Sequence, residues 1–335
     1  MHKVIFHSKK HAHSLYLKVS RGQMKAVSLF SGCGGSDAGL IKAGFEIVMA
    51  NDILPYAKEV YEANHPETDY VLQNIEIVKS FPSADILAGC YPCQGFSQGG
   101  RREADNKLNY LYKEFARALN LIKPKAFIVE NVSGMTSSTF KHLLQDQIKV
   151  FTEIGYKVVY KVLNASDYGV AQERRRIFIV GIRSDLGLEF DFPEATHGNE
   201  ITPKVNLKKA LEGLPDWPDK KEYYDNGFHW YYMSRNRKRN WDETSRTIVS
   251  SARHTLLHPI SPDMVKIKTD HWEFVSDAPA RRFTYKEAAR IQGFGDLIFP
   301  REDEVTLDNK YKVVGNAVPP PLFEVIAKRV KSLIF

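Results

Sequence analysis

One loop constrains the fold of this chain more than any other part of the sequence: residues 89–97 read GCYPCQGFS. They follow a short, mainly apolar run at 84–88, which has the length of a buried strand. Glycines on both sides and Pro92 in the middle predict an exposed, shaped loop. Open α/β sheets hold their reactive groups in such loops, so Cys93 is a candidate reactive thiol. The alternative is a buried, inert thiol, which is common for free cysteines.

The composition is that of an ordinary globular protein. Its 335 residues are 43% hydrophobic and 26% charged, and they are enough for two lobes around a large core. No apolar run approaches the ~18 residues of a membrane span, and the first residues do not form a signal peptide. The three cysteines are too few for a disulfide framework, and no histidine pair is spaced for a zinc site. We therefore expect a cytoplasmic protein without a metal or a membrane partner.

The charge of the chain suggests a polyanionic partner. The formal net charge is +7, and residues 1–25 contain basic but no acidic side chains. We interpret residues 1–24 as a basic N-terminal extension, either a solvated tail or leader or an arm that contacts nucleic-acid phosphates.

A glycine-rich turn follows the first predicted strand. The β-prone run at 26–30 leads into SGCGGSDAG at 31–39. A strand, a glycine-rich turn and a helix in succession are typical of a nucleotide-cofactor site. The dinucleotide fingerprint would place its third glycine at position 37, where Asp37 stands. A nicotinamide enzyme is therefore disfavoured.

An acidic residue ends the second predicted strand. Residues 45–50 form that strand, and Asn51 and Asp52 follow it. A carboxylate at this position can accept hydrogen bonds from ribose hydroxyls. Asp52 could equally be the N-cap of the helix predicted at Pro55–Asn64, and the two roles are compatible.

Two later strands carry further polar candidates. The strand at 126–129 is followed by Glu130, a candidate acid beside the cysteine loop, although such a residue is more often a helix cap or a surface group. Before the strand at 177–181 stand three successive arginines, 174–176. These cannot all face one way on an extended chain, so some must enter a cleft or pair with acids. Arginine suits a clamp on a phosphate or a carbonyl.

Together these segments resemble the principal motifs of cytosine-C5 DNA methyltransferases. Six segments follow that family's order across about residues 26–335: 30–39, 92–94, 130–132, 172–176, 281–294 and 315–319. The resemblance implies an α/β fold, an S-adenosylmethionine-dependent methyltransferase with a Rossmann-like, mostly parallel sheet and a smaller, irregular target-recognition domain. It implies a catalytic domain at 25–196, a target-recognition domain at 197–301 and a return segment at 302–335.

The resemblance implies a sequence-specific DNA (cytosine-5)-methyltransferase. In this reading Cys93 adds to carbon 6 of a cytosine flipped out of double-stranded DNA, so that carbon 5 can take a methyl group from S-adenosylmethionine. Glu130 would lie on the ring's N3, and Arg176 would hold the carbonyl at carbon 2. Arg174 would contact a phosphate or Glu130.

The resemblance also assigns a set of residues to the cofactor: Phe30, Ser31, Gly32, Gly34, Gly35, Asp52, Ile53, Asn74, Ile75, Pro92, Asn316 and Ala317. The glycine-rich loop would surround the methionine end, and Asp52 would bind the ribose. Two positions depart from the family pattern. Asp52 replaces a more usual Glu, and Asn74 stands where an Asp usually meets the adenine amino group, although an Asn carbonyl can still accept that bond.

An aromatic and basic patch interrupts the βα rhythm in residues 197–280. Between 228 and 241 aromatic residues alternate with Arg235, Arg237 and Arg239, a composition that suits stacking on and charge pairing with nucleic acid. The alternative is a solvated face. In the resembled family this interval reads the DNA sequence, which favours DNA contact over a solvated face. The resemblance also implies that Gln94 and Ser97, in the cysteine loop, contact the extruded nucleotide.

Two helices are predicted near the end of the chain. Thr284 as N-cap, Glu287 three residues later and Gly293 as a stop define the first, which the family uses to support the recognition lobe. The second, at about 320–333, would pack back on the first lobe.

The leading interpretation is a prokaryotic, monomeric modification enzyme whose cognate restriction endonuclease shares the DNA site without binding the enzyme. Three alternatives are disfavoured. A tRNA methyltransferase of the same family would carry a Cys-Phe-Thr signature, which is absent. A thiol–disulfide oxidoreductase would use the C-x-x-C at 90–93 but leaves Glu130 and the arginines without a role. A DNA-binding module without activity does not require Cys93, Glu130 and Arg176.

Overall fold

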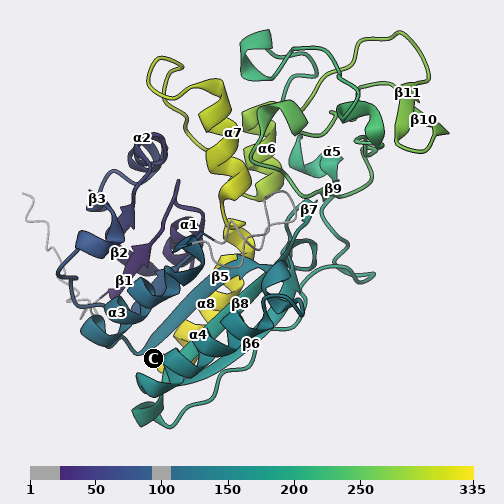
Figure 1. The fold of residues 1–335 in the computed structure, drawn as a ribbon. Helices are drawn as coiled ribbons and strands as arrows, with labels where there is room; N and C mark the ends of the chain where they lie inside the picture. Colours follow the sequence, from purple (N-terminus) through teal and green to yellow (C-terminus); the bar gives the residue numbers. More distant parts are fainter. Residues whose placement is uncertain (1–22, 93–106) are drawn as a thin grey trace, which may run out of the picture.

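The structure, a computed structural model, describes residues 23–92 and 107–335. Its main lobe is built on a seven-stranded sheet of order β3-β2-β1-β4-β5-β8-β6 (Figure 1). The strands are β1 (Met24–Leu29), β2 (Phe45–Asp52), β3 (Tyr70–Leu72), β4 (Ile86–Gly89), β5 (Ala126–Val132), β6 (Tyr156–Asn164) and β8 (Arg175–Arg183). Strands β1 to β5 pair in parallel, and β8 is antiparallel to both of its neighbours. The mostly parallel α/β sheet that the sequence predicts is therefore confirmed.

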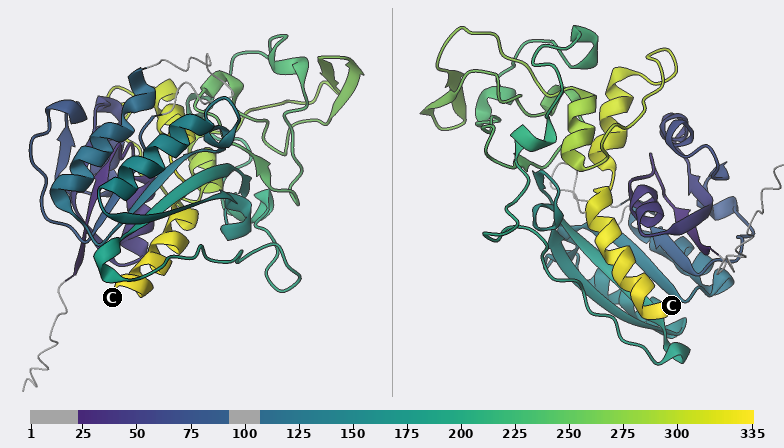
Figure 2. Two further views of the ribbon diagram at one scale, coloured as in Figure 1. Left: turned by 60° about the horizontal axis from the view of Figure 1, so that its bottom comes forward. Right: turned by 180° about the vertical axis from the view of Figure 1, so that it is seen from behind.

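Helices cover both faces of this sheet, which explains why its central strands are mostly apolar. Helices α1 (Gly35–Lys42) and α8 (Pro320–Ile334) pack on one face, and α3 (Tyr112–Ile122) and α4 (Lys141–Glu153) pack on the other (Figure 2). Successive residues of a strand face opposite sides, and in β1 both sides are buried. The final helix lies along α1, as predicted. Among the described residues no helix is long and apolar enough to span a bilayer.

The second lobe is irregular, and its short elements lie between β8 and the two helices that follow. They include α5 (Leu207–Ala210), β9 (Ser245–Arg246) and the hairpin of β10 (Met264–Lys268) and β11 (His271–Phe274). Strand β7 (Gln172–Glu173) pairs with β9 and so joins the two lobes. The break in the βα rhythm is confirmed, whereas the boundaries 197 and 301 remain predictions.

Helix α6 (Tyr285–Gln292) begins and ends as its sequence predicts. The Thr284 hydroxyl accepts a hydrogen bond from the Glu287 amide at 3.0 Å, and the Glu287 carboxylate accepts one from the Thr284 amide at 2.8 Å. Gly293 ends the helix with a φ of 94°, a conformation that favours glycine. Glu287 also forms a buried ion pair with Arg281 at 2.7 Å, so this segment anchors the second lobe.

A second buried arginine organises the loop that carries the aromatic residues. Arg282 is 1% exposed, and its guanidinium lies 4.5 Å from the ring centre of Phe228 and 4.4 Å from that of Tyr232. It also donates to the carbonyls of Tyr224 at 3.0 Å and Asn226 at 2.8 Å. These contacts fix the backbone of a segment that contains little regular structure.

Candidate active site

The candidate site lies at the edge of the sheet where the parallel strands end. The chain runs outward from β1 to β2 and β3, and then returns to build β4 and β5 on the other side of β1. Ligands of open α/β sheets bind where the strand order reverses in this way, which here is the crevice between the ends of β1 and β4. The glycine-rich loop follows β1, and the cysteine loop follows β4.

The glycine-rich loop has a backbone that only this sequence pattern accommodates. Phe30 has a φ of 58° and Gly34 a φ of 88°, both in the left-handed region. A Cβ on Gly34 would lie 2.9 Å from the ring of His65, and a Cβ on Gly35 would lie 2.4 Å from the carbonyl oxygen of Val318. The glycines therefore let the loop pack closely against the segment that contains Ala317.

Asp52 binds this loop instead of capping the following helix. Its Oδ2 accepts a hydrogen bond from the Gly32 amide at 2.9 Å, and its Oδ1 accepts from the amides of Ile53 at 2.7 Å and Leu54 at 3.0 Å. The N-cap of α2 (Pro55–Asn64) is Leu54, without a side-chain cap bond, so the N-cap interpretation of Asp52 is wrong. Burial raises the pKa of Asp52, and the three amide donors oppose that rise.

Other predicted cofactor residues follow β2 and β3 or end α7. Asn74 follows β3, caps the turn Ile75–Ile77 by accepting from the Glu76 amide at 3.1 Å, and is half-buried. Ile75 is buried, whereas the Ile53 side chain is 59% exposed. Asn316 ends α7 (Leu307–Asn316) and is exposed. Their contacts with a cofactor remain predictions.

Glu130 and Arg176 form a buried ion pair at the end of β5. Glu130 lies opposite Phe178 in the β5–β8 ladder, so Arg176, two residues away on β8, shares its face. Arg176 Nε lies 3.0 Å from Glu130 Oε1, and Glu130 is 7% exposed. Burial raises the pKa of Glu130, and the charges of Arg176 and then Arg174 oppose that rise. A carboxyl group of this kind can keep a proton at a higher pH than a solvated one.

Arg174 binds backbone carbonyls in place of the expected hydrogen bond to Glu130. It is 2% exposed, and it donates to the backbone carbonyls of Ile248 at 3.1 Å, Gly315 at 2.8 Å and Ala317 at 3.1 Å. The guanidinium joins three chain segments and has no hydrogen bond to Glu130 among the described contacts. The expectation of a hydrogen bond to Glu130 is therefore corrected, because both terminal nitrogens of the guanidinium bind carbonyls. The alternative of a phosphate contact stays a prediction.

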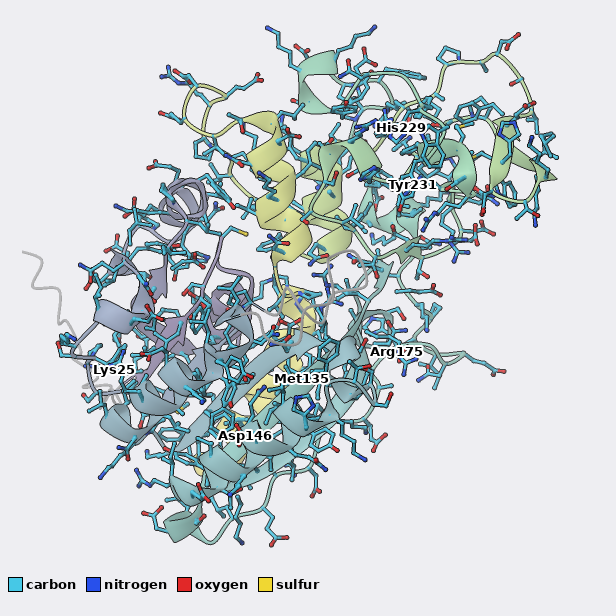
Figure 3. All side chains as sticks on the ribbon, viewed as in Figure 1. Lys25, Met135, Asp146, Arg175, His229 and Tyr231 are labelled. Carbon is cyan, nitrogen blue, oxygen red and sulfur yellow. The ribbon has the colours of Figure 1, made fainter. Side chains whose placement is uncertain are left out.

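The three arginines predicted to contact DNA differ in exposure. Arg235 is exposed and lies 5.4 Å from the ring centre of Tyr231, which is labelled in the second lobe in Figure 3. Arg237 is 7% exposed, and its Nε donates to the Tyr232 carbonyl at 3.0 Å. Arg239 pairs with Glu243 at 2.6 Å. Thus Arg235 presents its charge to solvent, whereas Arg237 and Arg239 support the patch through contacts within the chain.

Cys93, Gln94 and Ser97 lie outside the described residues, and their roles remain predictions. Cys90 is half-buried and packs against the core beneath the sheet edge. Its pKa is raised well above the usual value by burial and by the charge of Glu130. Cys90 is therefore a poor thiolate, which disfavours a dithiol enzyme. Among the described residues no group of three or more potential metal ligands occurs.

One supporting residue was not singled out from the sequence. Tyr91 precedes Pro92, is 4% exposed, and donates its hydroxyl to Gln147 Oε1 at 2.6 Å. Its carbonyl accepts from the Asn131 amide group at 3.2 Å, and its ring meets that of Phe30 edge to face at 5.9 Å. Tyr91 thus joins the two candidate loops through Phe30, and its hydroxyl binds a residue of α4 that is 56 positions away and that no local pattern indicates.

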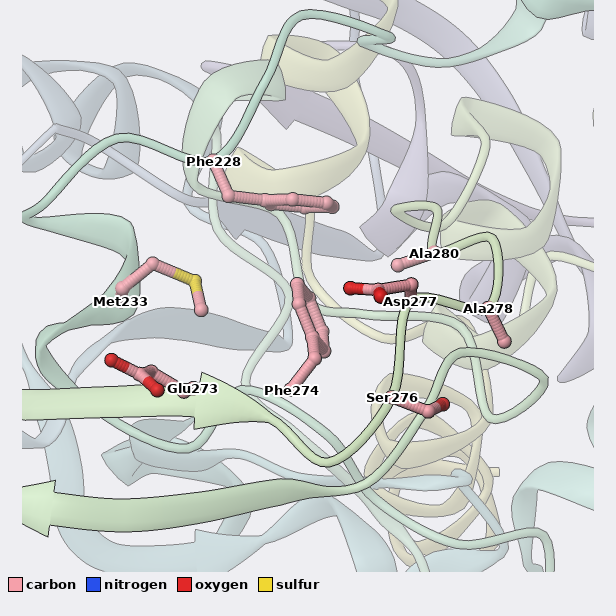
Figure 4. A pocket seen from close by; sticks show the side chains of 8 residues that line it. All are labelled: Phe228, Met233, Glu273, Phe274, Ser276, Asp277, Ala278 and Ala280. Atoms are coloured by element: carbon pink, nitrogen blue, oxygen red, sulfur yellow. The ribbon is translucent and has the colours of Figure 1, made fainter.

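A cavity in the second lobe is lined by residues that do not belong to this site (Figure 4). It has a volume of about 450 Å³ and is lined by Phe228, Met233, Phe274 and other residues, including the carboxylates of Glu273 and Asp277. Such carboxylates repel a phosphate, so we do not include the cavity in the candidate site.

Comparisons with known proteins agree with this geometry. Residues 24–332 match the family described as C-5 cytosine-specific DNA methylase. The chain is 38% identical to the type II methyltransferase M.NgoPII of Neisseria gonorrhoeae, over 93% of this chain and 96% of that protein. It is 39% identical to the type II methyltransferase M.FnuDI of Fusobacterium nucleatum, over 93% and 95%.

Solved structures share the fold. A prophage-encoded DNA modification methyltransferase of E. coli matches with a TM-score of 0.71 at 22% identity, over 92% of this chain and 99% of that one. A DNMT2 variant of Spodoptera frugiperda matches with a TM-score of 0.65 at 20% identity, over 92% and 98%. The family match across residues 24–332, together with relatives of 38% and 39% identity over most of their length, shows that this chain belongs to the C-5 cytosine-specific DNA methylases.

Proposed function

We propose that this DNA cytosine-5 methyltransferase uses S-adenosylmethionine to modify one cytosine in a short duplex sequence, as the modification enzyme of a restriction–modification system. The observation that carries the catalytic assignment is the buried Glu130–Arg176 pair, at the sheet edge that also bears the glycine-rich loop and Pro92. The type II methyltransferases among its relatives support the modification role.

The residues of the glycine-rich loop and of the neighbouring strand ends suit S-adenosylmethionine in their chemistry. A Cβ on Gly32 would meet no atom of the described residues within 4 Å, so these residues leave room for a ligand beside the loop backbone. Phe30 and Gly32 would face the methionine portion, Asp52 the ribose, and Asn74 the adenine amino group. When bound, S-adenosylmethionine supplies an electrophilic methyl group.

The nucleophile acts on the cytosine ring. Carbon 5 of cytosine is a weak nucleophile, so the proposed Cys93 thiolate first forms a bond to carbon 6 and pushes electron density toward carbon 5. After methylation, loss of the carbon 5 proton and expulsion of Cys93 restore the aromatic ring. Because carbon 6 is buried in a duplex, the base must leave the stack, which costs a few kcal/mol.

Glu130 and Arg176 would stabilise the charge that this addition creates. A protonated Glu130 can donate to N3 as negative charge develops there, and its burial favours the protonated form. Arg176 keeps the carboxyl group oriented and can bind the carbonyl at carbon 2, because a guanidinium has several donors in one plane.

The function is tested by incubating the purified protein with S-adenosylmethionine and plasmid DNA, and then mapping 5-methylcytosine by bisulfite sequencing. We expect complete methylation at one short sequence and none elsewhere. A parallel reaction with total tRNA serves as the comparison. Methyl transfer to tRNA alone, or no transfer to DNA, would contradict the proposal.

Replacing Asp52 with alanine should weaken cofactor binding. A charge-assisted hydrogen bond to a ribose is worth about 1.5–3 kcal/mol, so the dissociation constant of S-adenosylmethionine should rise about 10- to 150-fold. Calorimetric titration measures this, with the melting temperature as a control because three amides also lose their acceptor. An unchanged affinity in a folded variant would leave Asp52 with a role in loop structure only.

Replacing Arg235 with alanine should weaken DNA binding while cofactor affinity stays unchanged. The side chain is exposed in the second lobe. Loss of one phosphate contact lowers the slope of the logarithm of the binding constant against the logarithm of salt concentration by about one unit. Fluorescence anisotropy at several salt concentrations measures it. The matched control is Arg183→Ala, because Arg183 lies in the main lobe, at the end of β8 that is far from Arg176. Wild-type affinity and salt slope in Arg235→Ala would exclude this residue from the DNA contact.

A further inference from the structure

A buried carboxylate that the proposed reaction does not use lies beneath the glycine-rich loop. Asp37 is in the first turn of α1 and is fully buried. Its Oδ1 accepts hydrogen bonds from the hydroxyls of Ser28 at 2.5 Å and Ser36 at 3.0 Å, and its Oδ2 accepts one from the Tyr61 hydroxyl at 2.7 Å. The donors come from β1, α1 and α2, so one side chain joins three elements around the loop.

The serine side of this cluster reaches the loop directly. Ser31 donates its hydroxyl to Ser28, with distances of 3.1 Å to the Ser28 hydroxyl and 3.0 Å to its carbonyl. The amide of Asn51, next to Asp52, donates to the Ser31 hydroxyl at 3.2 Å. Asp37, Ser28 and Ser31 therefore form a chain of hydrogen bonds from the helix to the predicted cofactor residues.

The tyrosine side reaches the loop from α2 and β3. The ring of Tyr61 packs against that of Tyr70 with centres 4.7 Å apart, and the Tyr70 hydroxyl donates to the Gly32 carbonyl at 3.3 Å. Tyr61 also packs against His65 at 4.9 Å, and His65 lies where a side chain on Gly34 would collide. Asp37 therefore fixes the position of Tyr61, which contacts Gly32 through Tyr70 and Gly34 through His65.

The hydrogen bonds favour an ionised Asp37. Three hydroxyl donors converge on its two oxygens, and the N-terminus of α1 also favours a negative charge. Burial raises the pKa of Asp37, and the hydroxyl donors and His65 oppose that rise. Among the described ion pairs none joins Asp37 to a lysine or an arginine, and burial lowers the pKa of His65. An ionised Asp37 would therefore be balanced mainly by neutral donors, and its three converging hydroxyls are the geometry that suits a carboxylate.

The charge of Asp37 affects ionisable groups near the glycine-rich loop. Burial raises the pKa of Cys33 to about 12, and the charges of Asp37 and Asp52 add to the rise. Burial is the main cause of the raised pKa values of Tyr70 and Cys90. The charge of Asp52 for Tyr70, and that of Glu130 for Cys90, comes next, and the charge of Asp37 adds less. An ionised Asp37 therefore acts on Cys33 in the glycine-rich loop and on Cys90 after β4, and such a charge favours a cationic ligand near them.

We propose that Asp37 is a positioning residue that holds the glycine-rich loop through Ser28 and Tyr61 and whose charge favours the cationic sulfonium of S-adenosylmethionine over neutral S-adenosylhomocysteine. The inference rests on the proposed function, because it concerns the same crevice. Methyl transfer removes the sulfonium charge, so this carboxylate would bind the methyl donor more strongly than the product and would lessen product inhibition.

Two variants separate the charge from the hydrogen bonds. Asp37→Asn removes the charge and retains a side chain that can accept from the serines and donate to Tyr61. It should lower the affinity for S-adenosylmethionine about tenfold and that for S-adenosylhomocysteine less than about threefold. Tyr61→Phe keeps the charge but removes one donor, and it should lower both affinities by similar factors. Calorimetric titration of each variant with each ligand measures these ratios.

Tyr156→Phe is the matched control. Tyr156 is also buried and loses one hydrogen bond, to the Pro124 carbonyl at 2.7 Å, but it lies at the opposite edge of the sheet. It should leave both affinities unchanged. Equal losses for the two ligands in Asp37→Asn, or no loss, would overturn the role of the charge. If Asp37→Asn does not fold, unchanged affinities in Tyr61→Phe would overturn the positioning role.

The wild-type protein distinguishes this inference from the proposed function. If it binds no S-adenosylmethionine and methylates no DNA, the proposed function fails. If it binds and methylates while Asp37→Asn keeps the wild-type preference between the two ligands, only the inference fails.

Discussion

Cys93→Ser should abolish methyl transfer to DNA, whereas Cys90→Ala should retain substantial activity. A methyltransferase needs only the thiolate that reaches carbon 6, while a dithiol enzyme needs both sulfurs. Cys90 packs against the core, and its pKa is raised well above the usual value by burial and the Glu130 charge, so it is not equipped to attack. Incorporation of labelled methyl groups into duplex DNA measures the two activities.

A covalent trap identifies the attacking sulfur. In a duplex with 5-fluorocytosine at the target, fluorine cannot leave carbon 5 as a proton does, so the bond between Cys93 and carbon 6 should persist after methyl transfer. Denaturing gels should show a shifted protein–DNA band that depends on S-adenosylmethionine, in the wild type and in Cys90→Ala. A band in Cys93→Ser, or its loss in a folded Cys90→Ala variant, would contradict Cys93 as the sole nucleophile.

Glu130→Gln should lower kcat by about 10²- to 10⁴-fold, the usual contribution of a positioned acid. The amide matches the carboxyl group in shape but cannot transfer a proton to N3. Single-turnover methylation measures the loss, and the dissociation constants of DNA and S-adenosylmethionine are the controls, because the change removes little volume. A folded Glu130→Gln variant with wild-type kcat would exclude an acid role.

The pH dependence provides a second test of this role. Because the protonated form of Glu130 is the active one, kcat should fall as the pH rises through the pKa of Glu130, which burial raises above the ordinary value. Arg176 is the first of the groups that oppose this rise, so Arg176→Ala should move the alkaline limb to higher pH, besides lowering kcat. In Glu130→Gln this limb should be absent. An alkaline limb that persists in Glu130→Gln would belong to another group.

Local sequence patterns predicted the elements of the main lobe and the residues at their ends. The parallel sheet, the glycine-rich turn after β1, Glu130 in β5 and the capping box of α6 agree with the structure. Each depends on residues within a few positions along the chain, where strand alternation, glycine conformation and side-chain capping act. The order of the motifs was sufficient to indicate the family, which the comparisons confirm.

What the sequence by itself determined is therefore the fold of the main lobe and the kind of chemistry its loops can support. Only the tertiary structure decided the partners of the polar side chains. Arg174 and Arg176 are two residues apart, yet one binds carbonyls that lie 74 and 141 positions away and the other pairs with Glu130. Arg237 is buried by contacts within the recognition lobe, and Asp37 became notable only when three elements brought hydroxyl donors to it. Such partners are set by the packing of distant segments, because a buried polar group must bind whichever donor or acceptor the fold brings within about 3 Å.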